Sequence, residues 1–202
     1  MIQRIKSILN LISNVIHQRD VYLPWYKKSF GNFGENTVIN YPANITFREN
    51  IYIGDNTTIL NNSRINIYNY LTGQNSKVKI GSNCYIGYNI SILAGGNIII
   101  GDKVLIASNV LISSENHGMS PESQIPYMDQ PLSCKDVEIG DGSWLGEKVC
   151  ILPGVQIGKK CIVGAGSVVT KNVPDFCIAA GNPAKIIKKY NFDLHKWEKY
   201  NG

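Results

Sequence analysis

The stretch IGSNCYIGYNISILAGGNIIIGDKVLIASNVLISS, residues 80–114, has an isoleucine at every sixth position in two successive runs. Ile80 and Ile100 open the two runs, and a glycine follows each of them. The pattern continues outward in both directions until six blocks of 18 residues share it. Fourteen of the eighteen repeated positions are isoleucine, and the full set is Phe33, Ile39, Ile45, Ile53, Ile59, Ile65, Ile80, Ile86, Ile92, Ile100, Ile106, Ile112, Ile139, Leu145, Ile151, Ile157, Val163 and Val169.

A strict period of six differs from the 3.6-residue period of a helix and from the two-residue period of a strand. It predicts a stack of identical short coils, because a hexapeptide repeat is typical of a β-helix. Three hexapeptides per coil predict a triangular prism with a short strand on each side and a turn at each corner. The glycine after the first anchor of each block predicts a corner with a positive φ or a close backbone approach.

A second inward position lies four residues after each anchor and should be small, since it is next to a corner. Its occupants include Thr37, Ala43, Thr57, Ser63, Cys84, Gly96, Ser143, Val149, Val155, Cys161 and Ser167. Glu49, Asn69 and Asn116 are exceptions, and the coil is expected to be irregular at these three places. Packing is the expected role of the two cysteines at this position, Cys84 and Cys161.

The segments outside the repeat divide the chain into 1–32, a helix and lead-in; 33–174, the β-helix; and 175–202, a tail with a short helix near Trp197. Apolar residues at helical spacing in 1–20 predict an amphipathic helix that caps the prism, packs on a neighbouring subunit or lies on a membrane. A nine-residue insertion at 71–79 has no evident chemical role. Residues 118–138 form a long loop with three prolines, and such loops are commonly functional.

The composition excludes several classes of protein. The 202 residues suggest a single domain, and no run of about twenty apolar residues predicts a membrane span. The N-terminus does not resemble a secretory signal, so secretion is not expected. Five cysteines without CxxC pairing favour reduced thiols, and the net charge of +5 is too mild and too dispersed to indicate nucleic acid.

The repeat over roughly 33–174 resembles the left-handed parallel β-helix of the hexapeptide-repeat acyltransferases. The ungapped stretch from Ile100 through His117 is similar to the galactoside, maltose and polysaccharide O-acetyltransferase branch. The expected fold is therefore all-β: a left-handed parallel β-helix of about six coils, with an N-terminal amphipathic helix, one long excursion loop and a short C-terminal helix. The resemblance implies a homotrimer with sites between adjacent prisms, acetyl-CoA as co-substrate and no required metal.

His117 is the candidate general base, because it lies at the mouth of the long loop and the resemblance places the catalytic histidine there. An ordinary imidazole has a pKa of about 6.5 and can accept a proton from a sugar hydroxyl at physiological pH. The oxyanion donor is left open between backbone N–H groups and the indole N–H of Trp144. His17 and His195 are expected to be ordinary surface residues.

Coenzyme A binding is implied by a second similarity, in several short stretches between Trp144 and Lys185. Glycines would let the pantetheine arm lie against the coil, and lysines would contact the phosphates as point charges. The expected coenzyme residues are Trp144, Gly146, Ala165, Gly166, Thr170, Lys171, Lys185 and Lys188.

The acceptor is less well defined. Gly87 and Gly95 stand where galactoside-type relatives have an asparagine and an aspartate that hold the sugar, so a small galactoside or maltose acceptor is not favoured. The candidate replacements are Tyr88, Asn89, Glu115 and Asn116, with Tyr127 of the long loop as a cover.

The favoured function is acetyl-CoA-dependent O-acetylation of a bacterial surface polysaccharide or its precursor. The alternatives are N-acetylation of an amino sugar nucleotide, or O-acetylation of serine or an antibiotic. A zinc-dependent carbonic anhydrase on the same prism would need three histidines on the coils, and only His117 lies on one. A cytoplasmic protein is expected, reaching the inner face of the membrane if the first helix binds lipid.

Overall fold

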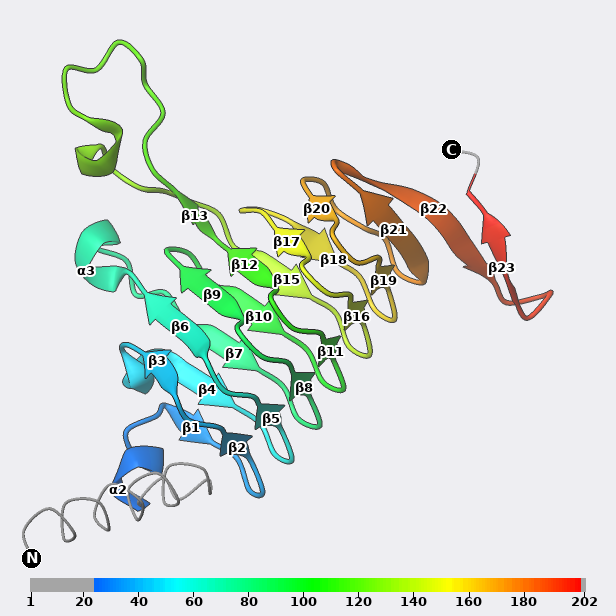
Figure 1. Cartoon of the computed structure of the whole chain (residues 1–202), viewed down its shortest axis with the longest axis horizontal. Coiled ribbons are helices and arrows are strands. Elements are labelled where there is room, and N and C mark those ends of the chain that lie inside the picture. The colour runs from blue at the N-terminus through cyan, green and yellow to red at the C-terminus, as the bar shows by residue number, and fades with distance from the viewer. Residues whose placement is uncertain (1–23, 201–202) are drawn as a thin grey trace, which may run out of the picture.

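The computed structural model describes residues 24–200, in which short strands stack into three faces of a prism (Figure 1). Sheet A contains β1 (Asn32–Phe33), β4 (Ile51–Ile53), β7 (Val78–Ile80), β10 (Ile98–Ile100), β15 (Val137–Ile139) and β18 (Gln156–Ile157). Sheet B begins with β2 (Val38–Ile39), β5 (Thr58–Ile59), β8 (Tyr85–Ile86), β11 (Leu105–Ile106), β16 (Trp144–Leu145), β19 (Ile162–Val163) and β21 (Cys177–Gly181). Sheet C contains β3 (Ala43–Ile45), β6 (Ser63–Ile67), β9 (Ser91–Ala94), β12 (Leu111–Ser113), β17 (Cys150–Ile151) and β20 (Val168–Val169).

All of these strands pair in parallel with their neighbours in the sheet, and the chain visits sheets A, B and C in turn. We call the turns after a sheet A, sheet B and sheet C strand the first, second and third corners. The predicted stack of parallel strands is confirmed.

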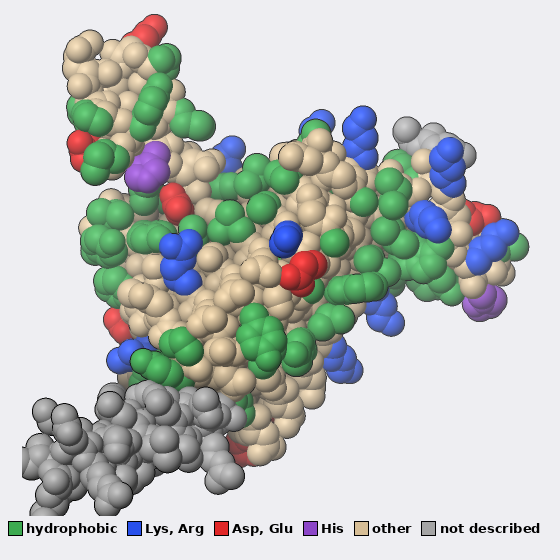
Figure 2. All heavy atoms as spheres, in the orientation of Figure 1, with side chains coloured by type: hydrophobic (Ala, Val, Ile, Leu, Met, Phe, Trp, Pro, Cys, Tyr) green, Lys and Arg blue, Asp and Glu red, His purple; other side chains and the backbone are tan. Residues whose placement is uncertain are grey.

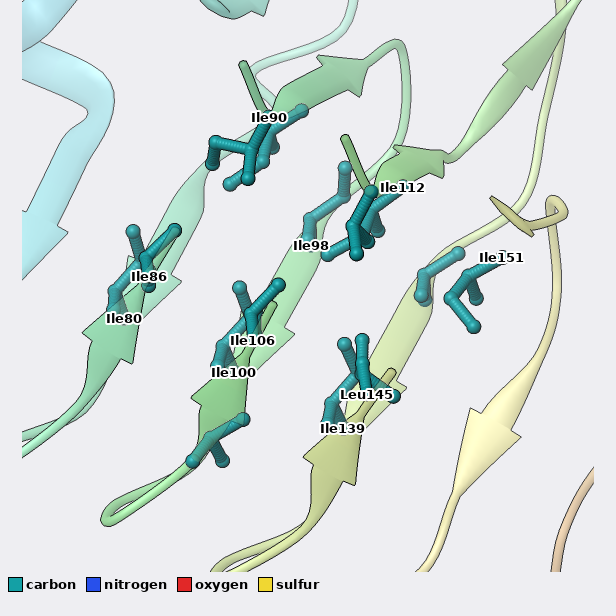
Figure 3. Close-up of a cluster of buried hydrophobic side chains, with 14 of the residues drawn as sticks. Ile80, Ile86, Ile90, Ile98, Ile100, Ile106, Ile112, Ile139, Leu145 and Ile151 are labelled. Carbon is teal, nitrogen blue, oxygen red and sulfur yellow. The ribbon is translucent and has the colours of Figure 1, made fainter. Parts of the chain in front are cut away.

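The repeated apolar residues fill the inside of the prism (Figure 3). Register pairs Ile80 with Ile100 and Ile100 with Ile139, so equivalent anchors stack from coil to coil. Sixteen of the eighteen anchors are buried, and the other two, Phe33 and Ile45, are half-buried in the first coil. Each fully buried isoleucine contributes about 1.5–3 kcal/mol relative to exposure, so this ladder supplies most of the apolar stabilisation.

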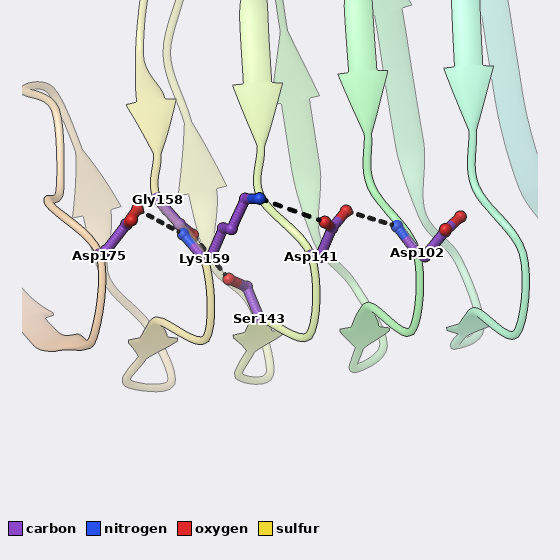
Figure 4. A network of polar contacts seen from close by, with 6 residues as sticks. All are labelled: Asp102, Asp141, Ser143, Gly158, Lys159 and Asp175. Carbon is purple, nitrogen blue, oxygen red and sulfur yellow. Dashed lines mark hydrogen bonds and ion pairs between the residues drawn. The ribbon is translucent and has the colours of Figure 1, made fainter. Parts of the chain in front are cut away.

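The glycine of the first corner is explained by close approach rather than by a positive φ. A Cβ on Gly101 would collide with the carboxylate of Asp141 in the next coil. That carboxylate accepts a hydrogen bond from the backbone N–H of Asp102 (3.0 Å), and Asp175 accepts one from Lys159 (2.8 Å) in the same way (Figure 4). The left-handed conformation belongs instead to corner residues further along, many of them asparagines.

The small inward residues near the first corner link successive coils. Thr37 Oγ1 donates to the carbonyl of Gly54 (2.6 Å) and accepts from the N–H of Thr57 (3.1 Å). Cys84 occupies the same position two coils on, where it is buried and its Sγ lies 3.2 Å from the carbonyl oxygen of Gly101. The structural role expected for Cys84 is confirmed.

The three positions where a larger polar residue replaces the small inward residue do lie where the coil is irregular. Glu49 is in the 3-10 helix η1 (Arg48–Asn50), and Asn69 begins the short helix α3 (Asn69–Thr72). Asn116 ends β13 (Glu115–Asn116), which leaves sheet C to start the long loop.

The C-terminal helix predicted near Trp197 is wrong. The chain turns back after β21 into β22 (Ala184–Asn191) and β23 (Lys196–Lys199), which extend sheet B in antiparallel fashion. The unpaired edge of β21 favours this arrangement, because it offers a row of backbone hydrogen-bonding groups. Trp197 packs against Tyr190 across the hairpin with ring centroids 5.2 Å apart, and Ile186 packs on the core.

At the opposite end of the prism, α2 (Pro24–Lys27) is followed by Phe30, which is buried against the core with its ring 5.2 Å from that of Phe33. The amphipathic helix predicted over 1–20 falls outside the described residues. Within residues 24–200, no helix is long and apolar enough to cross a membrane.

Candidate functional site

His117 stands at the start of a long excursion from the third corner. Strand β13 runs out from the coil and pairs in antiparallel fashion with β14 (Ser133–Cys134), which brings the chain back. The excursion between them projects from the prism and carries the 3-10 helix η2 (Tyr127–Asp129) (Figure 1). His117 follows β13 directly, and its side chain is exposed. The imidazole is therefore held at the root of a two-stranded stem and is open to solvent.

Two serines attach this stem to the prism. Ser114 is fully buried; its hydroxyl donates to the carbonyl of Gly96 (2.9 Å) and accepts from the N–H of Gly96 (3.1 Å). Ser113 Oγ donates to the carbonyl of Glu115 (2.9 Å). The direction in which β13 leaves the coil is thus fixed three residues before His117.

Gln130 holds the far part of the excursion together. Its buried side-chain amide donates to the carbonyls of Ser120 (3.1 Å) and Ile125 (3.0 Å) and accepts from the N–H of Ser120 (3.0 Å). These residues border a hollow of about 310 Å³ that also includes Tyr127. The exposed Tyr127 lies in the same excursion as His117, but beyond the stem.

Gly95 lies beneath the root of the stem at the preceding coil. A Cβ at this position would meet Glu115 Cβ at 2.6 Å and Cys134 Sγ at 2.7 Å. The space that a side chain would need is therefore filled by both strands of the stem. This packing explains why glycine stands here, and it is a constraint that the sequence did not reveal.

The predicted site residues fall into two groups. Glu115, Asn116 and His117 lie together at the third corner, and Thr170 and Lys171 lie at the same corner beyond β20. Because β12 and β20 are separated only by β17, the two parts of this group are about 10 Å apart along the prism. Thr170 and Lys171 are both exposed.

The second group lies at the second corner and on the outer face of sheet B. Trp144 is 46% exposed on β16, where it pairs with Leu105 and Ile162. Gly146 lies in the corner that follows, and a Cβ there would be 2.7 Å from the backbone nitrogen of Ala165. Gly166 has a positive φ of 70°, which favours glycine, and no atom lies within 4 Å of where its Cβ would be.

Tyr88 and Asn89 belong to this second group and do not lie beside His117. Both are exposed at the second corner, where the N–H of Tyr88 donates to Ser108 Oγ (3.1 Å). Sheet C separates this corner from the third corner by about 15 Å, at a rise of about 3.3 Å per residue. Within one chain, the candidate acceptor residues are therefore divided between two corners.

A β-bulge places Lys185 and Lys188 on one face. Ala180 pairs with Lys185 and Ile178 pairs with Lys188, with a register shift between the pairs. Cross-strand partners point to the same side of a sheet, so both lysines share the outer face that carries Trp144. Strict alternation would have put these two lysines on opposite faces, and the bulge at Ile187 has no signal in the sequence.

Burial makes the thiols of Cys84, Cys134 and Cys161 harder to ionise. Burial raises the pKa of the Cys84 and Cys161 thiols above the ordinary value. Burial also raises the pKa of Cys134, with the carboxylates of Glu115 and Asp136 adding to the effect. Among residues 24–200 no cluster of three or more histidine, cysteine, aspartate and glutamate side chains could hold a metal ion.

Sequence comparison finds the hexapeptide repeat in two parts of the chain. The bacterial transferase hexapeptide (six repeats) family matches residues 136–171, and the hexapeptide repeat of succinyl-transferase matches residues 77–114. The putative acetyltransferase YJL218W of Saccharomyces cerevisiae is 42% identical over 163 residues, which cover 81% of this chain and 68% of that protein.

A second relative is the putative lipopolysaccharide biosynthesis O-acetyl transferase WbbJ of Escherichia coli K12. It is 44% identical over 93 residues, which cover 43% of this chain and 47% of WbbJ. The putative acetyltransferase SACOL2570 of Staphylococcus aureus is 48% identical over 58 residues, 29% of each protein. In each of these two comparisons, the matched region covers less than half the length of the relative.

Two solved structures share the fold at 26% identity. One is a variant of AntD, an N-acyltransferase from Bacillus cereus, in complex with dTDP and coenzyme A. Its TM-score is 0.71, and the superposed part covers 84% of this chain and 90% of the AntD chain. The other is a maltose O-acetyltransferase from Clostridium difficile 630, with a TM-score of 0.57. The superposed part covers 86% of this chain and 80% of the maltose O-acetyltransferase chain.

Proposed function

The chain belongs to the hexapeptide-repeat acetyltransferases, and from this premise we propose that it transfers an acetyl group from acetyl-CoA to a hydroxyl of a bacterial surface polysaccharide or its precursor. The relative WbbJ is named for lipopolysaccharide O-acetylation, and the fold is shared with a maltose O-acetyltransferase. We extend the family's left-handed winding and about six coils to this prism, and we expect it to act in the cytoplasm.

The observation that carries the proposal is the position of His117, exposed at the root of a stem that two serines attach to the coil. In the proposed reaction, the neutral imidazole accepts the proton of the acceptor hydroxyl. The hydroxyl oxygen bonds to the carbonyl carbon of the thioester, and the C–S bond then breaks. The imidazolium returns its proton to the sulfur, which leaves as coenzyme A thiol. General-base assistance of this kind is worth about 10²–10⁴-fold in rate.

The division of the predicted residues between two corners favours a site shared between subunits. The width of sheet C, about 15 Å, separates the third corner that carries His117 from the second corner that carries Gly146 and Ala165 in the same chain. A homotrimer that places the third corner of one prism against the second corner of the next would bring the two groups together. We therefore propose that the imidazole of one subunit faces coenzyme A bound mainly by its neighbour.

For the coenzyme, we propose that the outer face of sheet B contributes Trp144, Lys185 and Lys188. The shared face supports this assignment, because it joins an exposed aromatic ring to two exposed positive charges. Lys171 and Thr170 at the third corner would approach the phosphates from the other prism. Lysine serves phosphate groups as a point charge, so exact geometry is not required for this contact.

N-acylation of an amino sugar nucleotide is the second candidate, and one observation favours it. AntD is an N-acyltransferase solved with dTDP, and its TM-score to this chain is higher than that of the maltose O-acetyltransferase. The two candidates differ in the nucleophile, which is an amine in one case and a hydroxyl in the other.

Consumption of acetyl-CoA with a panel of acceptors tests the proposal. The panel contains bacterial polysaccharide fragments, amino sugar nucleotides and serine, and mass spectrometry identifies the acetylated atom. We expect an ester on a saccharide hydroxyl that mild alkali removes. An alkali-stable amide on an amino sugar nucleotide would establish the second candidate instead, and acetylation of neither sugar class would contradict both.

A further inference from the structure

The segment between β6 and β7, residues 68–77, forms a small aromatic platform together with Phe47. Helix α3 exposes Tyr70, with 67% of its surface accessible, and the Tyr70 ring stacks on the half-buried Phe47 ring at 5.9 Å between centroids and 8° between planes. Tyr68 lies beside Tyr70 with ring centroids 6.4 Å apart. One face of the Tyr70 ring is thus backed by Phe47.

Phe47 takes a left-handed backbone conformation (φ 52°, ψ 51°) to make this contact. A bulky residue in this region is a genuine outlier and costs about 1–3 kcal/mol. Asparagine is the commonest residue with this conformation at the first and second corners, and Phe176 is another phenylalanine that adopts it. The Phe47 ring packs on the hydrophobic core on one side and contacts the Tyr70 ring as well.

The platform is fixed to the corner that carries the candidate base. Ser76, near the end of the segment between β6 and β7, is buried, and its hydroxyl donates to the carbonyl of Gly95 (2.6 Å). Gly95 in turn packs under Glu115 and Cys134 of the excursion stem. The platform segment follows β6 and the excursion follows β12, and only β9 lies between these strands, so the roots of the two segments are about 10 Å apart. Figure 2 shows hydrophobic side chains over both segments on one side of the molecule.

The segment that carries Tyr68 and Tyr70 is polar but uncharged, because no charged residue occurs between Arg64 and Lys77. Next to Phe47, Arg48 is engaged with Ser29 and the Tyr26 ring, and the neighbouring exposed charge is the acidic Glu49. Amide side chains form the base instead: Asn50 Nδ2 donates to Asn75 Oδ1 (2.7 Å), and Asn69 Oδ1 accepts from the N–H of Ser76 (2.8 Å). A membrane surface or a nucleotide would be matched by basic side chains. An exposed ring among amides matches an uncharged ligand with an apolar face and hydroxyl groups, which describes a sugar ring.

We propose that Tyr70 is a second sugar subsite, which binds a ring of an oligosaccharide acceptor while another ring of the same chain presents its hydroxyl to His117. The inference rests on the proposed function and specifies it: the acceptor is an oligosaccharide rather than a single sugar. The roots of the two segments are about 10 Å apart, a separation on the scale of a short oligosaccharide. The platform selects acceptors by length.

The test uses the full-length protein and saccharides of graded length, from mono- to tetrasaccharide, prepared from a polysaccharide that it acetylates. Wild-type kcat/KM should rise about tenfold between the monosaccharide and the tetrasaccharide, as expected for one aromatic stacking contact. Tyr70→Ala should abolish that length preference, whereas Tyr70→Phe, which keeps the ring, should retain it. Leu71→Ala is the matched control, because Leu71 is exposed on the same helix but has no ring.

The outcomes separate this inference from the function on which it rests. A wild-type protein that acetylates no saccharide would overturn both. A wild-type protein with a length preference that Tyr70→Ala leaves intact would overturn the role of Tyr70 alone. Light scattering and binding to phosphatidylglycerol vesicles are measured on the same variants. A change in subunit number or in vesicle binding, with the length preference intact, would assign the platform to a second copy or to a membrane.

Discussion

Replacing Gly95 with alanine should reduce turnover strongly while leaving the prism folded. The new Cβ would lie 2.6 Å from Glu115 Cβ, and carbon atoms pack best at about 3.5–4.0 Å. Neither this Cβ nor that of Glu115 can rotate away, because both are fixed to their backbones. Strand β13 must therefore move outward by about 1 Å, and His117, two residues further on, moves with it.

The magnitude follows from that displacement. Overpacking of this kind costs about 1–3 kcal/mol in stability, which lowers the melting temperature without unfolding the protein. A misplacement of a catalytic group by about 1 Å can cost about a hundredfold in rate. We therefore expect Gly95→Ala to lower kcat by about ten- to a hundredfold and to leave coenzyme A affinity nearly unchanged.

The assay is steady-state consumption of acetyl-CoA, with thermal unfolding followed on the same samples. Ile53→Val is the matched control, since Ile53 is fully buried away from the excursion and the change costs about 0.5–1.5 kcal/mol. The control should lose stability but not turnover. If Gly95→Ala turns over at the rate of Ile53→Val, the stem does not set the position of His117 and the reasoning is refuted.

Three further predictions concern the core, the coenzyme and the thiols. Ile106→Ala should lower the free energy of unfolding by about 2–5 kcal/mol in denaturant titration, whereas the neighbouring exposed Leu105→Ala should cost less than about 1 kcal/mol; equal losses would contradict the inward assignment of Ile106. Lys171→Glu should weaken binding of coenzyme A more than binding of acetyl-pantetheine in calorimetry, and equal losses would exclude a phosphate contact. Because burial raises the pKa of Cys84 and Cys161, a smaller fraction of each is thiolate at pH 8 than in a free thiol. Iodoacetamide should therefore label these two cysteines only after denaturation. Rapid labelling of either cysteine in the native protein, mapped by mass spectrometry, would contradict its burial.

The fold could be predicted from sequence because its pattern is local and repeated. Ile86, Ile106 and Leu145 stack because each occupies the same place in its own coil, and that place can be counted along the chain. The same counting identified Asn69 and Asn116 as points of departure, since an asparagine side chain is larger than the small residues that the inward position next to a corner accepts.

The errors and omissions involve contacts between segments that follow no such count. The tail forms a hairpin instead of the expected helix near Trp197, because the open edge of β21 pairs with β22 and β22 pairs with β23. The common face of Lys185 and Lys188 depends on a bulge. The positioning roles of Ser114 and Gln130 depend on hydrogen bonds across the excursion, and no spacing indicates them.

The most direct measurement of the central claim is the single-turnover rate of acetyl transfer by His117→Ala at saturating acetyl-CoA, with coenzyme A binding measured by calorimetry on the same protein. The account predicts a rate at least about a hundredfold below wild type, with an unchanged melting temperature and nearly unchanged coenzyme affinity. A variant that transfers acetyl groups at close to the wild-type rate would contradict the account, because the exposed imidazole at the root of the stem would then not be the base.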